Sequence, residues 1–375
     1  MASAESAGLD PDRLARAYAL LDHAVATGAI PGAALLVARH GQPIAPHVCG
    51  VQYLAPDSPP IRPDTIFLVA SVTKPVTATA AMLLVERGKL LLNERAADYI
   101  PEFGNRGKEA VRIRHLLTHT SGLPDMVADD RALRRRHAPL SEFLARVCEA
   151  ELAFPPGTHI QYQSMGFLLL AAIVERIEGV SFPDFLRREI FEPLGMRDTG
   201  LGAQGLEIDR IAQVNVPEEM RGADWGWNES WWRHFGAPWG GMFTTVGDFF
   251  RFCQLFLNGG ELAGVRLLSP ATVEEMTCNQ TGQMPTIPVE EQYRQAWGLG
   301  WAIAGRRDPG SGWSNYGDLV APETFGHGGA TGTLVWADPT RGLVCILFTT
   351  EPTALSSGLA ARCSNLVAAA ALSRA

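Results

Sequence analysis

The chain has 375 residues, of which 46% are hydrophobic and 19% charged, so it can bury a large core and lacks a composition typical of disorder. Its formal net charge of −8 argues against nucleic acid or an anionic membrane as a partner, because both bind basic surfaces. No stretch approaches the roughly 20 apolar residues of a membrane-spanning helix, and the first ten residues lack the basic start and apolar run of a secretory signal.

The six cysteines are widely scattered, and none of them forms a CxxC pair. This distribution indicates free thiols in a reducing compartment and argues against disulfides or structural zinc. We therefore expect a cytoplasmic protein. The sequence leaves open a leader that has been removed.

The predicted elements change in character along the chain. The start combines a helix that ends near Gly28 with a strand at 32–38 and its hairpin partner at 44–51. Helical patterns then dominate, over residues 77–88, 113–119, 140–149, 166–178, 182–191 and 246–257. Strand-like runs return at 297–304, 331–337 and 343–349, followed by an Ala-rich closing helix.

Strands at both ends of the chain, with helices between them, indicate one sheet built from distant segments. We predict an α/β fold with an antiparallel sheet flanked by N- and C-terminal helices and with a large, mostly helical insertion. The sheet domain would comprise residues 1–66 and 286–375, and the helical domain residues 67–285. A site is expected in the cleft between the two parts.

The segment Ser71-Val72-Thr73-Lys74 lies at the start of a predicted helix. Side chains three residues apart on a helix are neighbours, so Lys74 can reach the Ser71 hydroxyl. A neutral lysine amine can take the proton of a serine and make it a nucleophile. Pro75 cannot donate a backbone hydrogen bond, so regular helix should begin at or after Ser71, which leaves free N–H groups at the helix mouth for a developing oxyanion.

Composition makes this pair unlikely to be accidental. With 16 serines and 3 lysines in the chain, chance predicts only about 0.13 Ser-x-x-Lys strings. Lysine contributes three of the 32 basic residues and arginine the rest. Because arginine cannot be deprotonated, a lysine retained at position 74 indicates a group that must lose its proton.

Other catalytic and metal-binding patterns are weaker. His115 and His119 are four residues apart and could share one helix face, but no glutamate lies between them and no third zinc ligand is evident. No Gly-x-Ser-x-Gly string occurs, which removes the nucleophile-elbow hydrolases. No Gly-rich phosphate loop occurs either. We therefore expect no metal and no cofactor.

Two further segments resemble motifs of the superfamily of serine β-lactamases, penicillin-binding proteins and related esterases. The stretch Tyr162-Gln163-Ser164 is similar to the Tyr-x-Asn element of that superfamily, and His327-Gly328-Gly329 stands where relatives carry Lys-Thr-Gly. The resemblance runs from about Gly28 to Thr350 and is greatest to the class C β-lactamase-like esterases, the family VIII carboxylesterases, and D-aminopeptidases. It implies a β-lactamase/transpeptidase-like fold.

The resemblance also implies roles for individual residues. Tyr162 would share proton transfer with Lys74, and the backbone N–H groups of Ser71 and Ala330 would form the oxyanion hole. Ser164, His327, Gly328 and Gly329 would contact the substrate. Two departures from the superfamily pattern bear on specificity: Ser164 replaces an asparagine, and His327 replaces a permanently charged lysine. An unperturbed histidine is mostly neutral at pH 7, so both changes favour an ester over a β-lactam.

We therefore expect a serine hydrolase that forms an acyl-enzyme on Ser71 and acts on carboxylic esters of small to medium acyl groups. The same residues would also serve a β-lactamase, a D-aminopeptidase or D-Ala carboxypeptidase, or an acyltransferase. A catalytically inactive binding scaffold is the alternative of another class. The expected partner is a small ester or amide substrate, with no nucleic acid and no membrane, and the oligomeric state stays open.

Five tryptophans fall between Trp225 and Trp239, among several Gly and Pro residues. Such a cluster is typical of an aromatic loop that receives an apolar substrate group. Packing inside the helical domain explains it equally well. The sequence leaves these two interpretations open.

Overall fold

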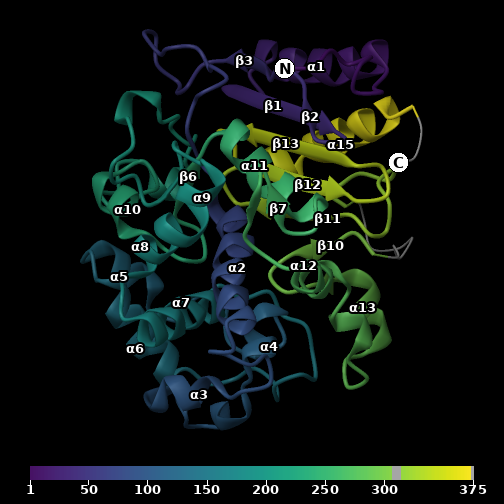
Figure 1. The fold of residues 1–375 in the computed structure, drawn as a ribbon. Coiled ribbons are helices and arrows are strands. Elements are labelled where there is room, and N and C mark those ends of the chain that lie inside the picture. The colour runs from purple at the N-terminus through teal and green to yellow at the C-terminus, as the bar shows by residue number, and fades with distance from the viewer. Residues whose placement is uncertain (306–313, 373–375) are drawn as a thin grey trace.

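The centre of the fold is an eight-stranded sheet, seen in a computed structural model that describes residues 1–305 and 314–372. The strand order is β2-β1-β13-β12-β11-β10-β9, with β3 also paired to β1, and the pairings between these described strands are antiparallel. The strands are β1 (Gly32–Arg39), β2 (Gln42–Pro43), β3 (His47–Gly50), β9 (Ala296–Trp297), β10 (Ala302–Ile303), β11 (Phe325–Gly329), β12 (Thr333–Asp338) and β13 (Leu343–Thr349). Figure 1 shows purple β1 beside yellow β13, so strands from the two ends of the chain are neighbours.

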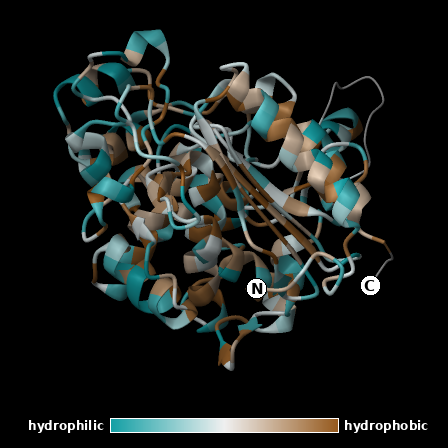
Figure 2. Cartoon of the chain, turned by 90° about the horizontal axis from the view of Figure 1, so that it is seen from above, coloured by the Kyte–Doolittle hydropathy of each residue, from teal (hydrophilic) through white to brown (hydrophobic). Residues whose placement is uncertain are grey.

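Both faces of this sheet are covered by apolar side chains. Along β1, Leu35 and Val37 belong to a core with the terminal helices α1 (Pro11–Ala26) and α15 (Leu359–Ala370). Leu36, between them, points to the larger core on the opposite face. The two directions follow from the two-residue repeat of a strand, and burial on both sides explains why β1 and β13 read as continuous apolar runs. Figure 2 shows the brown strands between helices on either side.

The helical part packs on one face of the main sheet, and α1 and α15 pack on the other. Its central element is α2 (Thr73–Glu86), in which every residue from Thr73 to Leu84 is buried. The other helices between the two groups of strands are α3 (Ala96–Tyr99), α4 (Ile113–Leu117), α5 (Asp130–Arg135), α6 (Leu140–Glu149), α7 (Met165–Glu178), α8 (Phe182–Leu186), α9 (Glu192–Leu194), α10 (Ser230–Phe235), α11 (Val246–Leu257), α12 (Pro270–Thr277) and α13 (Val289–Arg294). A short α14 (Thr353–Ser356) precedes α15.

Two small sheets and several single turns complete the fold. Strands β4 (Phe67–Leu68), β5 (Gly200–Leu201) and β6 (Met242–Thr244) form a three-stranded sheet, and β7 (Glu261–Leu262) pairs with β8 (Val265–Arg266). The 3-10 turns are η1 (Ala70–Val72), η2 (Pro101–Phe103), η3 (Lys108–Ala110), η5 (Ile208–Arg210), η6 (Glu218–Met220) and η7 (Thr281–Gln283), and η4 (Arg187–Phe191) is a π-helical turn. The β4–β6 pairing matters for the site because η1 follows β4 directly.

The predicted α/β fold with an antiparallel sheet, flanking terminal helices and a helical insertion is confirmed. Individual elements differ from the prediction. The hairpin partner of β1 is divided into β2 and β3, the strand predicted at 297–304 is divided into β9 and β10, and the helix predicted at 182–191 changes to π geometry after Leu186. Helix α2 begins at Thr73, four residues before the predicted start, because Pro75 falls in its first turn, where a missing N–H costs no helical hydrogen bond.

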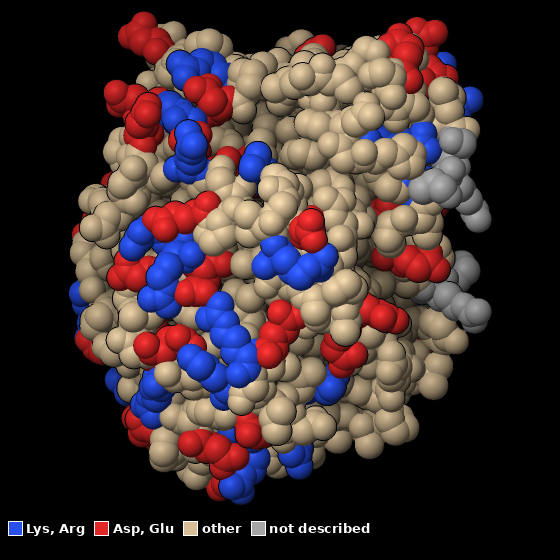
Figure 3. Space-filling view, viewed as in Figure 1, with Lys and Arg blue, Asp and Glu red and all other residues tan. Residues whose placement is uncertain are grey.

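The division into residues 1–66 with 286–375 and residues 67–285 stays a prediction, and its segments 306–313 and 373–375 lie outside the described residues. Among the described helices, none combines the length and the apolar character needed to cross a membrane. Figure 3, which has the viewpoint of Figure 1, shows charged side chains of both signs interspersed over the helical part.

Because the side chains of the central strands are buried on both faces of the sheet, truncating one of them should lower the free energy of unfolding substantially. Leu347 on β13 is 1% exposed, whereas Leu91 is 59% exposed. We expect Leu347→Ala to lower the free energy of unfolding by about 2–5 kcal/mol, because it removes buried methyl groups and leaves a cavity. Leu91→Ala, the same chemical change at the surface, should cost less than about 0.5 kcal/mol. Urea denaturation followed by tryptophan fluorescence checks both, and equal midpoints for the two variants would contradict the described burial.

Candidate active site

The turn that carries Ser71 lies between the small sheet and the central helix. Ser71 is part of η1, and α2 begins two residues later. Ala70 has a φ of 45°, in the left-handed region that non-glycine residues rarely adopt. Such a conformation persists only where the surroundings enforce it, and it is frequent at functional sites. The turn holds Ser71 half-buried at the mouth of α2.

Lys74 lies beside Ser71 and is completely buried. Its Nζ is 3.1 Å from Ser71 Oγ and donates a second hydrogen bond to the Trp239 carbonyl at 2.9 Å. Burial lowers the pKa of this amine to about 7, against a smaller opposing effect of the Asp125 carboxylate. A large fraction of Lys74 is therefore neutral near pH 7, so a lone pair is available next to the serine hydroxyl.

Tyr162 completes the polar group around the serine. The Lys74 Nζ lies 4.7 Å from the centre of the Tyr162 ring, and Tyr162 lines the same cavity as Ser71. Burial raises the pKa of Tyr162, so its hydroxyl stays protonated at neutral pH. The structure thus brings Ser71, Lys74 and Tyr162 together, with the tyrosine able to pass on a proton rather than to start as an anion.

Strand β11 packs against η1, the turn that carries Ser71. A Cβ on Gly329 would collide with the Val69 carbonyl oxygen and with Thr333 Oγ1, so glycine lets β11 approach η1 closely. Ala330 follows β11 and lines the same cavity as Ser71. Among the described residues, neither the Ser71 nor the Ala330 backbone N–H has a hydrogen-bond acceptor. Two free donors beside a nucleophile are the elements of an oxyanion hole.

His327, on β11, is a buried and neutral imidazole. Its Nδ1 is 2.7 Å from the Gly328 carbonyl oxygen, and since only a protonated nitrogen can donate to a carbonyl, Nε2 carries the lone pair. Burial and the nearby Lys74 lower the pKa of His327 to about 3. The ring faces Tyr162 at a centroid distance of 6.1 Å. His327 lies beside Tyr162, but His327, Gly328 and Gly329 do not line the cavity that holds Ser71 and Ala330, so their contact with a substrate stays a prediction.

His119 is a neighbour of Tyr162 that the sequence did not assign to the site. It is buried, stacks on the Tyr162 ring at 4.6 Å, and accepts the Gln163 N–H at its Nδ1. Helix α4 ends at Leu117, so His115 and His119 do not share a helix face, and the Nδ1 of His115 accepts the Arg112 N–H. The expected helical arrangement of these two histidines is wrong, because the chain turns at His119, where φ is 59°.

A cavity of about 360 Å³ opens onto Ser71. Ser71, Tyr162, Ser164 and Ala330 line it, and four of the five clustered tryptophans form part of its wall. These tryptophans are Trp225, Trp227, Trp232 and Trp239, whereas Trp231 lies outside the cavity and packs on Phe235. The aromatic cluster therefore both lines the cavity and packs inside the helical part, and its reception of a substrate group stays a prediction. The charged lining residues are Asp125, Asp130, Arg131, Arg134 and Glu219, and sequence reasoning assigned none of them.

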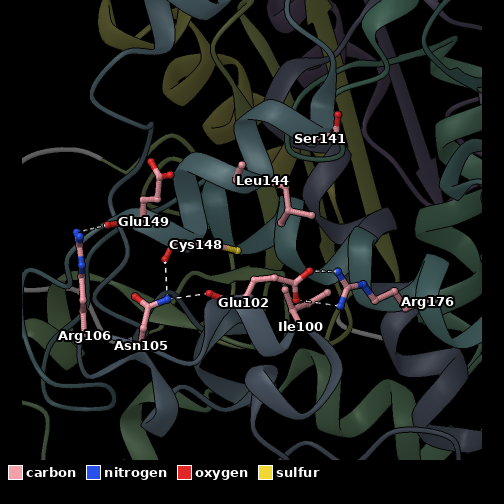
Figure 4. Close-up of a pocket in the computed structure, with 10 residues that line it drawn as sticks. Ile100, Glu102, Asn105, Arg106, Ser141, Leu144, Cys148, Glu149 and Arg176 are labelled. Carbon is pink, nitrogen blue, oxygen red and sulfur yellow. Dashed lines mark hydrogen bonds and ion pairs between the residues drawn. The ribbon is translucent and has the colours of Figure 1, made fainter.

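A second cavity lies among α6, α7 and η2, away from the Ser71 group (Figure 4). Its charged side chains are already paired: Arg176 binds the Glu102 carboxylate at 2.6 Å, and Arg106 donates to the Glu149 carbonyl at 2.6 Å. Asn105 donates to the carbonyls of Glu102 and Cys148. Because these polar groups bind one another, the cavity offers few of them to a ligand.

Comparison with known proteins agrees with this geometry. The model of the Beta-lactamase family matches residues 18–369. Esterase EstB from Burkholderia gladioli is 37% identical over 228 residues, which cover 56% of this chain and 57% of the esterase, so the chain spans little more than half of that relative. Penicillin-binding protein 4 from Amycolatopsis lactamdurans is 31% identical over 87% of this chain and 82% of its own. Among solved structures, EstCE1, a hydrolase with promiscuous acyltransferase activity, superposes with a TM-score of 0.77 at 22% identity over 96% of this chain and 99% of its own.

The hydrogen bond between Lys74 and Ser71 predicts covalent labelling of the serine. A fluorophosphonate should add once to the intact protein, because the neutral amine removes the hydroxyl proton as phosphorus is attacked. Intact-mass analysis would show one adduct, and peptide mapping would place it on Ser71. Ser121→Ala, which alters a buried serine outside the cavity lining, should label as the parent does, and Ser71→Ala should not label. An unlabelled parent protein would contradict an activated nucleophile.

Proposed function

Because the chain belongs to the Beta-lactamase family, we propose that it is a serine hydrolase that acts on carboxylic esters of small to medium acyl groups. The observation that carries the proposal is the 3.1 Å contact between Ser71 Oγ and the buried Lys74 amine, whose pKa lies at about 7. Activation of a serine by a neutral amine needs this proximity and this lowered pKa together.

The proposed reaction has two acyl-transfer steps. Ser71 Oγ attacks the ester carbonyl carbon while its proton moves to Lys74 Nζ. The tetrahedral oxyanion accepts hydrogen bonds from the Ser71 and Ala330 N–H groups, each of which is worth about a hundred- to a thousandfold in rate. When the carbon–oxygen bond of the ester breaks, the alcohol leaves with a proton supplied through Tyr162 and Lys74. Water then attacks the acyl-enzyme, gives its proton back through the same groups, and releases the acid and free Ser71.

The charges around the site favour an uncharged acyl group. His327 is neutral, with its pKa lowered to about 3, so it offers no fixed positive charge to a substrate carboxylate. The charged residues of the cavity wall comprise three carboxylates and two guanidiniums. One of these guanidiniums, Arg134, is already paired with Asp130 at 2.9 Å and stacked over Trp232. The tryptophan wall provides apolar area for an acyl or alcohol group.

The relatives support this class of reaction and also its alternatives. An esterase is among them, and so is a penicillin-binding protein. A β-lactamase, a D-aminopeptidase or D-Ala carboxypeptidase, or an acyltransferase would use the same Ser71, Lys74 and Tyr162. These alternatives differ from an esterase in the groups that bind the substrate, with Ser164 and His327 in the discriminating positions. We also propose a reducing, cytoplasmic location, supported by six cysteines that are all free thiols.

The proposed preference predicts a ranking of two chromogenic substrates. We expect kcat/KM for p-nitrophenyl butyrate to exceed that for nitrocefin by at least about tenfold, which corresponds to about 1.4 kcal/mol of transition-state stabilisation. Initial rates on purified protein provide the measurement, with Ser71→Ala as the background control. Faster turnover of nitrocefin would overturn the ester preference and leave the nucleophile intact. Turnover of neither substrate, together with no covalent labelling, would favour an inactive scaffold.

The lowered pKa of Lys74 predicts a rising limb in the pH profile. The amine acts as a base only after losing its proton, so kcat/KM should rise with pH through an apparent pKa of about 7 and fall about tenfold per pH unit below it. Lys74→Arg keeps the charge and removes the base, and we expect it to lose at least about a hundredfold in kcat/KM. Lys108→Arg, the same change at another fully buried lysine, should keep the parent profile. If kcat/KM of Lys74→Arg still rises with pH through about 7, Lys74 is not the base.

A further inference from the structure

Asp22, His47 and Cys49 bring three different metal-ligating groups together, far from the Ser71 turn in sequence. One ligand atom from each lies within 4.8 Å of the other two, and no second group of this kind occurs within residues 1–305 and 314–372. His47 Nε2 is 2.9 Å from Asp22 Oδ1. The Cys49 Sγ lies within 4.8 Å of both the Asp22 carboxylate and the His47 ring nitrogen. The three side chains thus face one common point.

The fold positions these side chains from two separate elements. His47 and Cys49 are two residues apart on β3, so both side chains point to the same face of the strand. Asp22 comes from α1, and Figure 1 shows α1 next to β3 at the top of the molecule. Tyr18, one helical turn before Asp22, stacks on the His47 ring with a centroid distance of 4.4 Å and an interplanar angle of 10°. The stacked ring is held with Nε2 directed at the carboxylate before any ion binds.

The same three residue types could also form a cysteine nucleophile with a histidine base, but their arrangement argues against it. In such a group the imidazole contacts the thiol, and the carboxylate contacts the far side of the imidazole. Here the carboxylate contacts Nε2 of the imidazole, and the thiol lies within 4.8 Å of both groups rather than at the end of a chain through the imidazole. The three ligand atoms surround one common point, as the ligands of a metal ion do.

We propose that Asp22, His47 and Cys49 form a binding site for a divalent transition-metal ion, with Zn²⁺ as its natural occupant. Imidazole, thiolate and carboxylate are the three ligand types that zinc takes in proteins. Bond lengths of about 2.0–2.3 Å in a tetrahedral site place neighbouring ligand atoms about 3.3–3.6 Å apart. The present separations, from 2.9 Å to at most 4.8 Å, reach that arrangement through side-chain movements of about 1 Å.

Ion binding exchanges protons for the metal. Cys49 loses its thiol proton to solvent, and His47 binds through the Nε2 lone pair of its neutral form. The Asp22 side chain is 53% exposed, so a water molecule can take the fourth position. The ion would link α1 to β3 through its ligands. Strand β3 is short and, among the described strands, pairs only with β1. The site would therefore stabilise the edge of the sheet, independently of the chemistry at Ser71.

The experiment uses cobalt as a spectroscopic probe and zinc as its competitor. Tag-free, reduced protein is titrated with Co²⁺, and a thiolate-to-cobalt charge-transfer band should saturate at one equivalent and disappear when Zn²⁺ is added. Cys49→Ser should abolish the band. Asp22→Asn, at an exposed helical position that leaves the fold intact, should weaken zinc binding by at least about tenfold. Zinc should also raise the unfolding temperature of the parent protein.

The matched control is Cys278→Ser, which removes another half-buried thiol at a distance from β3. This variant should retain the cobalt band and the parent zinc affinity. The proposal is overturned if the parent protein shows no charge-transfer band, or if Cys49→Ser and Asp22→Asn bind zinc as tightly as the parent. A band lost in Cys278→Ser but kept in Cys49→Ser would place the ion elsewhere and overturn it equally.

Discussion

The burial of one amine determines the chemistry that the fold supports. Lys74 lies in the first turn of α2, the central helix of the helical part, which is buried along nearly its entire length. A charged ammonium there is costly because it exchanges water for one hydroxyl, one carbonyl and two aromatic rings. The protein therefore stabilises the neutral amine, which is the form that can accept the serine proton. A polar surface in place of this packing would leave Lys74 an ordinary cation.

The cavity wall differs from the surroundings of Lys74 in the charges that it carries. The side chains packed around Ser71 form a buried inner group, the dry group, in which the pKa of Lys74 is lowered to about 7. The outer wall of the cavity carries both signs of charge among its tryptophans. His327 belongs to the dry group, because its ring is held against Tyr162 and Trp297. In the proposed reaction, acyl transfer uses the inner group, and the choice among esters, lactams and peptides rests on Ser164 in the cavity wall and on His327 beside Tyr162. This separation explains how one fold can serve several reactions.

The local features could be read from the sequence, and those made by distant contacts could not. The Ser71–Lys74 pair is separated by one helical turn, so its geometry followed from spacing, as did β1, α6, α11 and β13 from periodicity. Tyr162 and Ala330 reach Ser71 only through tertiary packing, and they were identified by resemblance alone. The stacking of His119 on Tyr162 and the charged cavity wall gave no local signal, because α5, η6 and loops that lie far from Ser71 in the sequence supply these side chains. The assignment of residues to two domains remains a prediction.

The position of β1 in the sheet has a consequence for how the chain is made. Its inner neighbour is β13, with Ala33 paired to Thr349, so the long edge of β1 lacks its partner until almost the whole chain has left the ribosome. During that interval a strand that is buried along its full length in the final fold exposes apolar faces and unpaired backbone groups. The helical part is synthesised before β13, so it can form first and provide one of the two faces that β1 needs. Premature termination anywhere before β13 would therefore yield a chain prone to aggregation rather than a shorter working enzyme.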